Sequence, residues 1–281
     1  MRSTTSRFLR GAPLLLLAFA AACGSRPVPL PPAVPLRSAT LAQLVSSFNR
    51  NASAIQTMSL KLNLSARAGK NKVPKMAAFL LIRKPGEIRL WATMTLVGKL
   101  FDMASNGQRF ELLLPTRNQF FVGRNNVIPA KVSNPLEKIR PQVILKALLI
   151  NPILPSTTVA LDPGAPAGTY RVLVLAPDGD GEQRVVRRIT FSRYDLLPHR
   201  QEIYDGDGIH LTQATYSEFA TRNNLPIPTD ITIERPVEGY SLHLQLLATG
   251  IVLNQPFNAP DIFQLTPPKG AAVITLGDPP K

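Results

Sequence analysis

The sequence is poor in the residues that most often carry covalent chemistry. It has one cysteine, three histidines and one tryptophan among 281 residues, and 32 lysines and arginines outnumber its 18 acidic residues. Because Cys23 has no partner in the chain, an intramolecular disulfide is excluded. No second long hydrophobic run follows the apolar stretch that ends at Ala22, which favours a soluble body.

Catalytic motifs are also missing. His199, His210 and His243 lie far apart and match no metal-binding spacing such as HExxH. There is no Gly-x-Ser-x-Gly elbow, phosphate loop or dinucleotide fingerprint. The Asp-Gly repeats at 178–181 and 205–208 lack the longer acidic series and distal glutamate of a calcium loop, so they predict turns. We therefore expect no catalytic residues, no metal and no cofactor, and a protein that is not an enzyme.

The first residues have the layout of a bacterial export signal. Arg2, Arg7 and Arg10 form a positive segment, and the stretch from Gly11 to Ala22 is uncharged and mostly apolar. This stretch is shorter than the roughly 20 residues that a membrane-spanning helix needs. Residues 1–22 are therefore predicted to be a signal peptide.

The residues around the single cysteine resemble the lipobox of bacterial lipoproteins. Ala20-Ala21-Ala22 precedes Cys23, although the family usually has leucine where Ala20 stands. The resemblance implies covalent lipid, including palmitate, on Cys23 and a membrane anchor through its acyl chains. A plain secreted protein with an incidental cysteine is the alternative.

Residues 23–37 are predicted to form the lipidated cysteine and a proline-rich stalk. The run RPVPLPPAVPL favours an extended polyproline arm without internal hydrogen bonds. No aspartate follows Cys23, which by the enterobacterial sorting rule implies the outer membrane, facing the periplasm, of a Gram-negative-type bacterium.

The basic composition raises the question of a nucleic-acid partner, since the net charge is +14. The cations are scattered along the sequence, and an exported lipoprotein rarely meets nucleic acid. We therefore expect no nucleic-acid partner. Attraction to anionic lipid headgroups or to acidic partners is the expected use of the charge.

Residues 38–281 are expected to form a single domain that is mainly β with a few helices. Ser38 to Thr57 has apolar residues at helical spacing. After it, period-two alternation and tight turns such as Asn106-Gly107 predict consecutive antiparallel strands. The predicted strands are 60–65, 75–83, 87–95, 99–105, 108–114, 119–124, 169–176, 183–193, 197–204, 209–219, 229–234, 241–253 and 272–276.

Two helices are predicted to interrupt the strands. Asn134 to Glu137 has a cap, a proline at the first helical position and a glutamate, which is a typical helix start. A second helix is predicted from Pro141 to Ile150, and its residues are apolar almost all round. Such a helix must be buried on several sides.

This order of elements resembles the LolA/LolB class of periplasmic lipoprotein carriers and receptors. RKPGEIRLWATMTLVGKLFDMASNGQRFELLLP follows the order of that class: Lys-Pro-Gly, Arg-Leu, a Leu-Gly corner, Asn/Asp-Gly and a returning strand. YSEFATRNNLPIPTDITIERP and GIVLNQPFNAPDIFQLTPPKG resemble the closing strands of an uncharacterised lipoprotein branch of the class. The resemblance implies a large antiparallel curved sheet, an unclosed half β-barrel, with helices covering its concave apolar face.

The resemblance also implies site residues. In LolB a leucine before the corner glycine projects into solvent and is needed for delivery; here Leu96 or Val97 takes that place, and an ordinary core position is the alternative reading. The helix from Pro141 would act as a lid through Val143, Ile144 and Leu148. The alternation gives the candidate cavity lining as Leu60, Leu62, Leu64, Leu81, Ile88, Leu90, Phe110, Leu112, Leu242, Leu244 and Leu246.

The leading hypothesis is a monomeric, membrane-anchored protein that binds acyl chains and takes part in lipoprotein or lipid transfer to the outer membrane, with lipoprotein or lipid as cargo. The first alternative is a non-enzymatic sensor or assembly module that binds a protein on the same scaffold. The second is a structural lipoprotein. A cavity of several hundred cubic ångströms is expected for the first hypothesis, and a filled core for the structural role.

Overall fold

The structure, a computed structural model, describes residues 35–125, 138–259 and 261–276. These residues belong to one unit, Pro35–Lys281. The predicted signal peptide, Cys23 and most of the stalk lie outside the described residues, as does the predicted helix start at Asn134.

Helix α1 spans Leu41–Ala54 and begins at a capping box. The Thr40 side chain accepts a hydrogen bond from the Gln43 amide, and the Gln43 side chain accepts one from the Thr40 amide. The helix therefore starts two residues after the expected cap, Ser38. Leu44, Phe48 and Ala52 form its buried face, as the helical spacing predicts.

Fourteen strands form one sheet, in the order β14-β6-β5-β4-β3-β2-β1-β13-β12-β11-β10-β9-β8-β7. The first half consists of β1 Thr57–Ala68, β2 Asn71–Arg83, β3 Glu87–Met94, β4 Gly98–Ser105, β5 Arg109–Leu114 and β6 Gln119–Arg124, with a 3-10 turn at Pro115–Arg117. The second half consists of β7 Thr158–Leu161, β8 Thr169–Pro177, β9 Gln183–Ser192, β10 Pro198–Tyr204, β11 His210–Arg222, β12 Leu225–Arg235 and β13 Tyr240–Leu253. The last strand, β14 Ala272–Leu276, adds to the first half beside β6.

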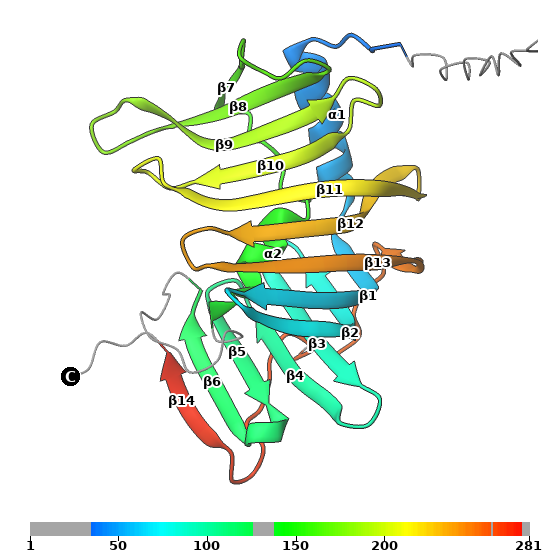
Figure 1. Cartoon of the computed structure of the whole chain (residues 1–281), viewed down its shortest axis with the longest axis vertical. Coiled ribbons are helices and arrows are strands. Elements are labelled where there is room, and N and C mark those ends of the chain that lie inside the picture. The colour runs from blue at the N-terminus through cyan, green and yellow to red at the C-terminus, as the bar shows by residue number, and fades with distance from the viewer. Residues whose placement is uncertain (1–34, 126–137, 260, 277–281) are drawn as a thin grey trace, which may run out of the picture. The chain divides into compact units, whose positions relative to one another are not determined.

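The sheet is not closed, and β7 and β14 are its end strands (Figure 1). The expected mainly-β, unclosed half-barrel is therefore confirmed. Every neighbouring pair is antiparallel except β14 with β6. The expectation of a wholly antiparallel sheet is wrong there, because β14 returns to the edge through a long connection and aligns with β6. Asn118, which precedes β6, accepts from the Ala272 amide and donates to Gly270.

One face of the sheet is apolar and carries both helices. Alternate residues of the strands are buried there, and α1 runs across β8 to β12 in Figure 1. Phe48 of α1 meets Phe191 of β9 edge to face, with ring centroids 6.3 Å apart. The second helix, α2 (Pro141–Ala147), packs on the same face against β3 and β4. We call this face the concave face.

The opposite face of β2 to β5 is covered by the chain after β13. Arg89 donates to the carbonyl of Ile262, and the guanidinium of Arg83 lies 4.9 Å from the ring centroid of Phe263. Leu81 pairs with Arg89 and lies on this face. It was expected to line the concave face, and this prediction is wrong because the run FLLI is buried on both sides and hides the alternation.

Candidate functional site

Beside α1, the concave face is covered by the segment Pro141–Ile153, which we call the lid segment. Helix α2 ends at Ala147, earlier than the predicted Ile150, and Leu149 has a positive φ of 59° that no α-helix contains. The predicted lid residues are Val143, Ile144 and Leu148, and all of them are buried.

The lid segment is held by side chains that bind its backbone carbonyls. Four carbonyls on the segment accept hydrogen bonds from four different elements. Gln201 Nε2 of β10 donates to the carbonyl of Lys146 (3.0 Å), and Tyr216 Oη of β11 donates to that of Ala147 (2.7 Å). Arg187 Nη1 of β9 donates to the carbonyl of Asn151 (3.1 Å), and Asn49 Nδ2 of α1 donates to that of Ile153 (2.7 Å). We call these four side chains the latch. They satisfy carbonyls that the short helix leaves without partners.

Arg187 is the only charged member of the latch. Its Nε donates to Gln201 Oε1 at 2.6 Å, and its guanidinium lies 5.1 Å from the ring centroid of Phe48. Burial lowers the pKa of Arg187 to about 10, which leaves it cationic at neutral pH. Its Nη2 has no hydrogen-bond partner among the described residues. A cation with an unused donor therefore lies under the lid segment.

Tyr216 is fully buried beside this cation. Loss of hydration raises the pKa of its phenol far above the usual range, so the hydroxyl stays protonated and remains a donor. Tyr216 and Arg187 are therefore fixed as donors among largely apolar neighbours.

Ten of the eleven predicted lining residues share the concave face. They are Leu60, Leu62, Leu64, Ile88, Leu90, Phe110, Leu112, Leu242, Leu244 and Leu246, all of them buried in one apolar cluster. The strand registers bring them together across neighbouring strands: Leu62 pairs with Leu246, and Leu64 pairs with Leu244. Leu81 is the exception described above.

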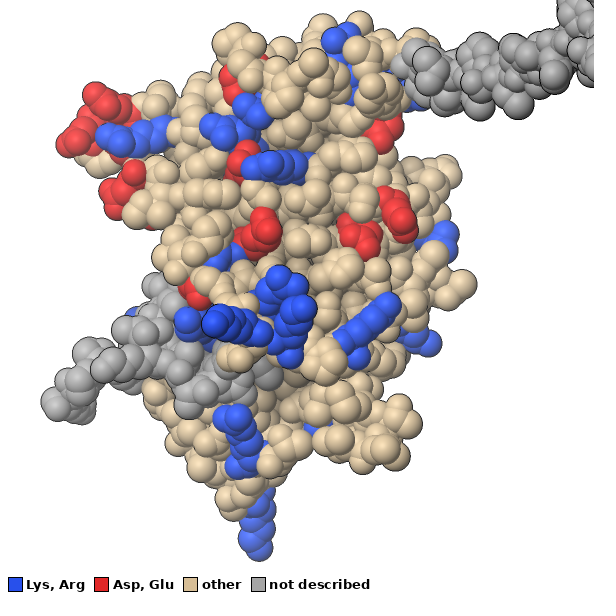
Figure 2. Space-filling model, in the orientation of Figure 1, with Lys and Arg blue, Asp and Glu red and all other residues tan. Residues whose placement is uncertain are grey.

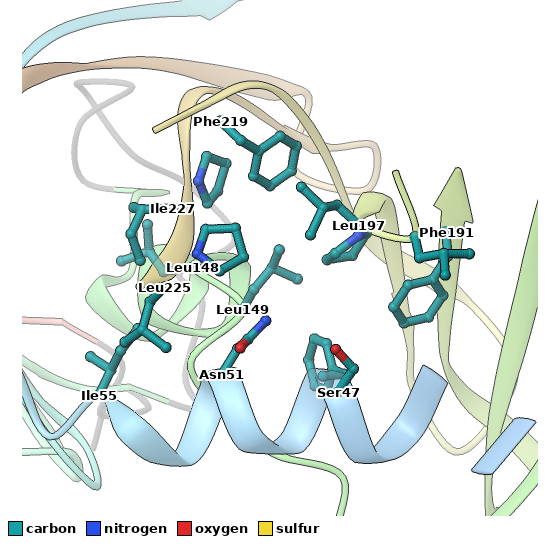
Figure 3. Close-up of a pocket in the computed structure, with 15 residues that line it drawn as sticks. Ser47, Asn51, Ile55, Leu148, Leu149, Phe191, Leu197, Phe219, Leu225 and Ile227 are labelled. Carbon is teal, nitrogen blue, oxygen red and sulfur yellow. The ribbon is translucent and has the colours of Figure 1, made fainter. Parts of the chain in front are cut away.

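The space left on this face is small. A pocket of about 40 Å³ lies between α1, the lid segment and β9 to β12 (Figure 3). Its walls are mostly apolar, with Phe191, Phe219 and Ile227 among them. A second, of about 20 Å³, lies near Ile139 and Tyr240. Acyl-chain sites need several hundred cubic ångströms. A larger hollow, of about 530 Å³, is an open groove on the solvent-exposed side of α1, so the described residues enclose no cavity of the expected size on the concave face.

The corner between β3 and β4 projects into solvent. Leu96 is 97% exposed and Val97 is 51% exposed, so Leu96 is the residue at the tip. Asp102 secures the base of this hairpin by accepting hydrogen bonds from Arg89 Nε and Nη2 (3.0 and 2.9 Å) and from Lys99 Nζ (2.6 Å). The alternative that Leu96 and Val97 are ordinary core residues is therefore wrong.

Two histidines have acidic neighbours that the sequence analysis did not anticipate. His199 Nε2 lies 2.8 Å from Asp195, and His243 Nε2 lies 2.9 Å from Asp230 on the adjacent strand. Both pairs are partly exposed. The ring of His199 lies 5.3 Å from that of Phe219, which lines the pocket on the concave face, whereas His243 alternates with Leu242 and Leu244 and lies on the opposite face. The described residues contain no group of His, Cys, Asp and Glu that could hold a metal ion. They also contain no helix long and apolar enough to cross a membrane.

The latch residues were missed by sequence analysis, although one signal was available. Arg187 shares its side of β9 with Ile189 and Phe191, two core residues, so a cation interrupts an apolar alternation. Gln201 and Tyr216 gave no comparable signal, because their partners lie in a distant segment.

Comparison with known proteins supports the fold. No protein-family model matches the sequence, and no curated protein matches it either. Three solved structures share the fold at low identity. A LolA superfamily protein from Nitrosomonas europaea is 13% identical, with 79% of this chain and 97% of that chain covered and a TM-score of 0.50.

A DUF1329 family protein from Desulfovibrio piger is 11% identical, covers 81% and 98% of the two chains and has a TM-score of 0.53. A domain from Vibrio parahaemolyticus assigned to outer membrane lipoprotein sorting is 8% identical, covers 78% and 94%, and has a TM-score of 0.50. The chain therefore has the LolA-like fold.

Proposed function

We propose that the protein binds acyl chains on its concave face by displacing the lid segment, and that it takes part in lipoprotein or lipid transfer at the cell envelope. The observation that carries this proposal is the latch: polar side chains from four elements hold one short apolar segment over an apolar sheet. A core that served only stability would not need a separate segment held in place by hydrogen bonds to its backbone.

The free energies involved are compatible with exchange. The lid segment buries seven aliphatic side chains, Val143, Ile144, Leu145, Leu148, Leu149, Ile150 and Ile153. At about 2 kcal/mol each, their burial contributes on the order of 14 kcal/mol. A sixteen-carbon chain gains a similar amount, at about 0.8 kcal/mol per methylene. The two nearly balance, so the latch hydrogen bonds, each worth about 1 kcal/mol, favour the closed form.

The proposal also assigns roles to the predicted acyl anchor and to the projecting corner. The acyl anchor on Cys23 would keep the protein at the membrane, and the projecting Leu96 would enter the lipid when cargo is delivered. The deposit of an amphiphile needs no catalytic residue, since it is a shift between closed and open populations.

Native mass spectrometry tests the proposal directly. The chain from Gly24 onwards, purified from a bacterial envelope without detergent, should carry co-purifying phospholipid or acylated species. A fluorescent fatty acid should bind to it and be displaced by unlabelled palmitate.

A protein that is always empty and takes up no acyl probe, even when the latch is weakened, would contradict acyl binding. The small pockets would then favour the alternative of an assembly module or a structural lipoprotein with a filled core.

A further inference from the structure

The charge of the protein is divided between the two halves of the sheet. The first 86 residues contain no aspartate or glutamate, and Glu87 is the first acidic residue. Strands β1 to β6 (57–124) carry twelve lysines and arginines against three acids, whereas β7 to β13 (158–253) carry eight against twelve. Cations that are scattered in the sequence are therefore gathered in one half of the fold.

Five of these cations lie on the β1–β2 hairpin, and we call them the basic hairpin patch. They are Lys61, Arg67, Lys70, Lys72 and Lys75, all exposed. None of them has an ion pair with any described residue. Figure 2 shows blue side chains over the region where β1, β2 and β13 lie in Figure 1, with red ones mostly above it.

The arrangement costs stability within the protein. Arg67 and Lys72 are direct cross-strand partners, and like charges in that position repel. With His243 they line one shallow surface groove. An external anion would remove the repulsion.

The exposed apolar corner lies at the same end of the sheet as this hairpin. Because β1 to β4 alternate in direction, the turn after Ala68 and the turn after Met94 face the same way. Ala77 of β2 pairs with Thr93 of β3. Lys75, two residues before Ala77, therefore lies beside the start of the corner. Lys99 pairs with Thr93 from the other side. Cations therefore flank Leu96 on both neighbouring strands.

We propose that the basic hairpin patch and the Leu96 corner together form a docking surface for a bilayer rich in anionic phospholipid. Such a surface offers what both features need: negative headgroups for the cations and, beneath them, an apolar layer for Leu96 and Val97. A nucleic acid offers no apolar layer. This inference does not depend on acyl binding by the concave face.

The acidic half of the sheet sets the orientation of the docked protein. The turns at 178–182 and 205–209 carry five acidic residues and belong to the half that contains β8 to β11. An anionic surface repels these turns and attracts the hairpin, so the β1 to β5 half faces the lipid.

Vesicle binding tests the docking surface. The chain from Gly24 onwards, which carries neither the acyl anchor nor the predicted signal peptide, is compared with the same chain bearing Lys70→Gln, Lys72→Gln and Lys75→Gln. Each cation near an anionic surface contributes about fivefold to binding, so the triple variant should bind phosphatidylglycerol vesicles on the order of 100-fold more weakly. Binding should fall with salt, and phosphatidylcholine vesicles should not distinguish the two proteins.

The matched control removes three exposed charges elsewhere, with Arg50→Gln on α1 and Arg109→Gln and Arg124→Gln at the opposite end of β5 and β6. It should retain most of the binding. Equal losses in both triple variants, or no loss in either, would overturn the proposal. Competition by inorganic phosphate beyond that of chloride at the same ionic strength would instead indicate a phosphate site and overturn it too.

Trp91 reports the position of the corner. It is the only tryptophan, it lies three residues before Met94, and it stacks on Phe79 with ring centroids 5.1 Å apart. Brominated anionic lipids should quench its fluorescence in the parent chain, and Leu96→Ser should reduce the quenching. Undiminished binding to polyglutamate, but not to vesicles, would assign the patch to an acidic protein. If the chain carries lipid but binds anionic and neutral vesicles equally well, the proposed function is retained and only the docking surface is contradicted.

Discussion

The hydroxyl of Tyr216, on β11, donates a 2.7 Å hydrogen bond to the carbonyl oxygen of Ala147, the last residue of α2. The two residues are far apart in sequence and both are buried. The bond joins the middle of the sheet to the segment that fills it. Its strength therefore bears on whether that segment can leave.

Tyr216→Phe should loosen the lid segment while preserving the apolar packing of the ring. The Ala147 carbonyl would lose its partner, at a cost of about 1 to 2 kcal/mol in the free energy of unfolding. If the lid opens for a ligand, the same loss favours the open form, and a fluorescent fatty acid should bind roughly 5- to 30-fold more tightly. Urea unfolding and a fluorescence titration measure the two effects.

Tyr194→Phe is the matched control, because Tyr194 is exposed and its hydroxyl has no partner among the described residues. Tyr194→Phe should change neither the free energy of unfolding nor the affinity for the fluorescent fatty acid. Loss of stability in Tyr216→Phe without any gain in acyl affinity would indicate a bond that is structural only.

Leu96→Glu combined with Val97→Glu should leave folding intact, because both side chains are exposed and contribute little to the core. Charges at the tip of the corner would oppose entry into lipid, so transfer of a bound acyl probe to vesicles should slow at least tenfold. Circular dichroism checks the fold, and stopped-flow transfer measures the rate. Thr95→Glu is a control next to the tip, and an equal effect there would point to charge alone.

Asp102 should make stability depend on pH. Burial raises the pKa of this carboxyl, but the hydrogen bonds and charges of Arg89 and Lys99 together lower it below its usual value. A lowered folded pKa contributes stability that is present above the unfolded pKa of about 4 and is lost as the pH falls through the folded value. The wild-type chain should therefore lose stability in acid below about pH 4.

Asp102→Asn should remove that contribution at neutral pH and cost about 3 kcal/mol, because Arg89 loses its partner. Urea unfolding at pH 7 and pH 3 should show a large difference between the two proteins at pH 7 and a smaller one at pH 3. Equal differences at both values would mean that the carboxyl does not titrate in this range.

Cys23→Ser should abolish palmitate labelling and release the protein from the membrane fraction, since no other cysteine exists to carry a lipid. Metabolic labelling and fractionation measure the two outcomes. Unchanged fractionation would contradict the acyl anchor. If high salt then released the protein, the basic hairpin patch would account for its association with the membrane.

The strands were predictable because one face of the sheet is buried and the other is not. Leu60, Leu62 and Leu64 alternate with polar residues, and their register followed from that pattern. Where both faces are covered, as at Leu81, the alternation vanishes and the face could not be predicted. The short edge strand β7 was missed because it lies in a run rich in proline and threonine.

The candidate site was harder to predict than the fold. The apolar character of Val143, Ile144 and Leu148 predicts burial, and the structure buries them. What the residues alone do not give is the pairing of distant partners, such as Asn49 with Ile153. The absence of a large cavity follows from the same cause, because the volume left on a face depends on which segment folds back over it.

The pairing of β1 with β13 imposes an order on assembly. Thr57 begins the first strand and Leu253 ends the thirteenth, yet Met58 and Leu253 are direct neighbours at the centre of the sheet. Until β13 has left the ribosome and any export channel, the long apolar edge of β1 has no partner, and such late, distant closure slows folding. A chain built this way stays threadable for most of its synthesis, and we expect helper proteins to protect the unpaired edge from aggregation until β13 arrives.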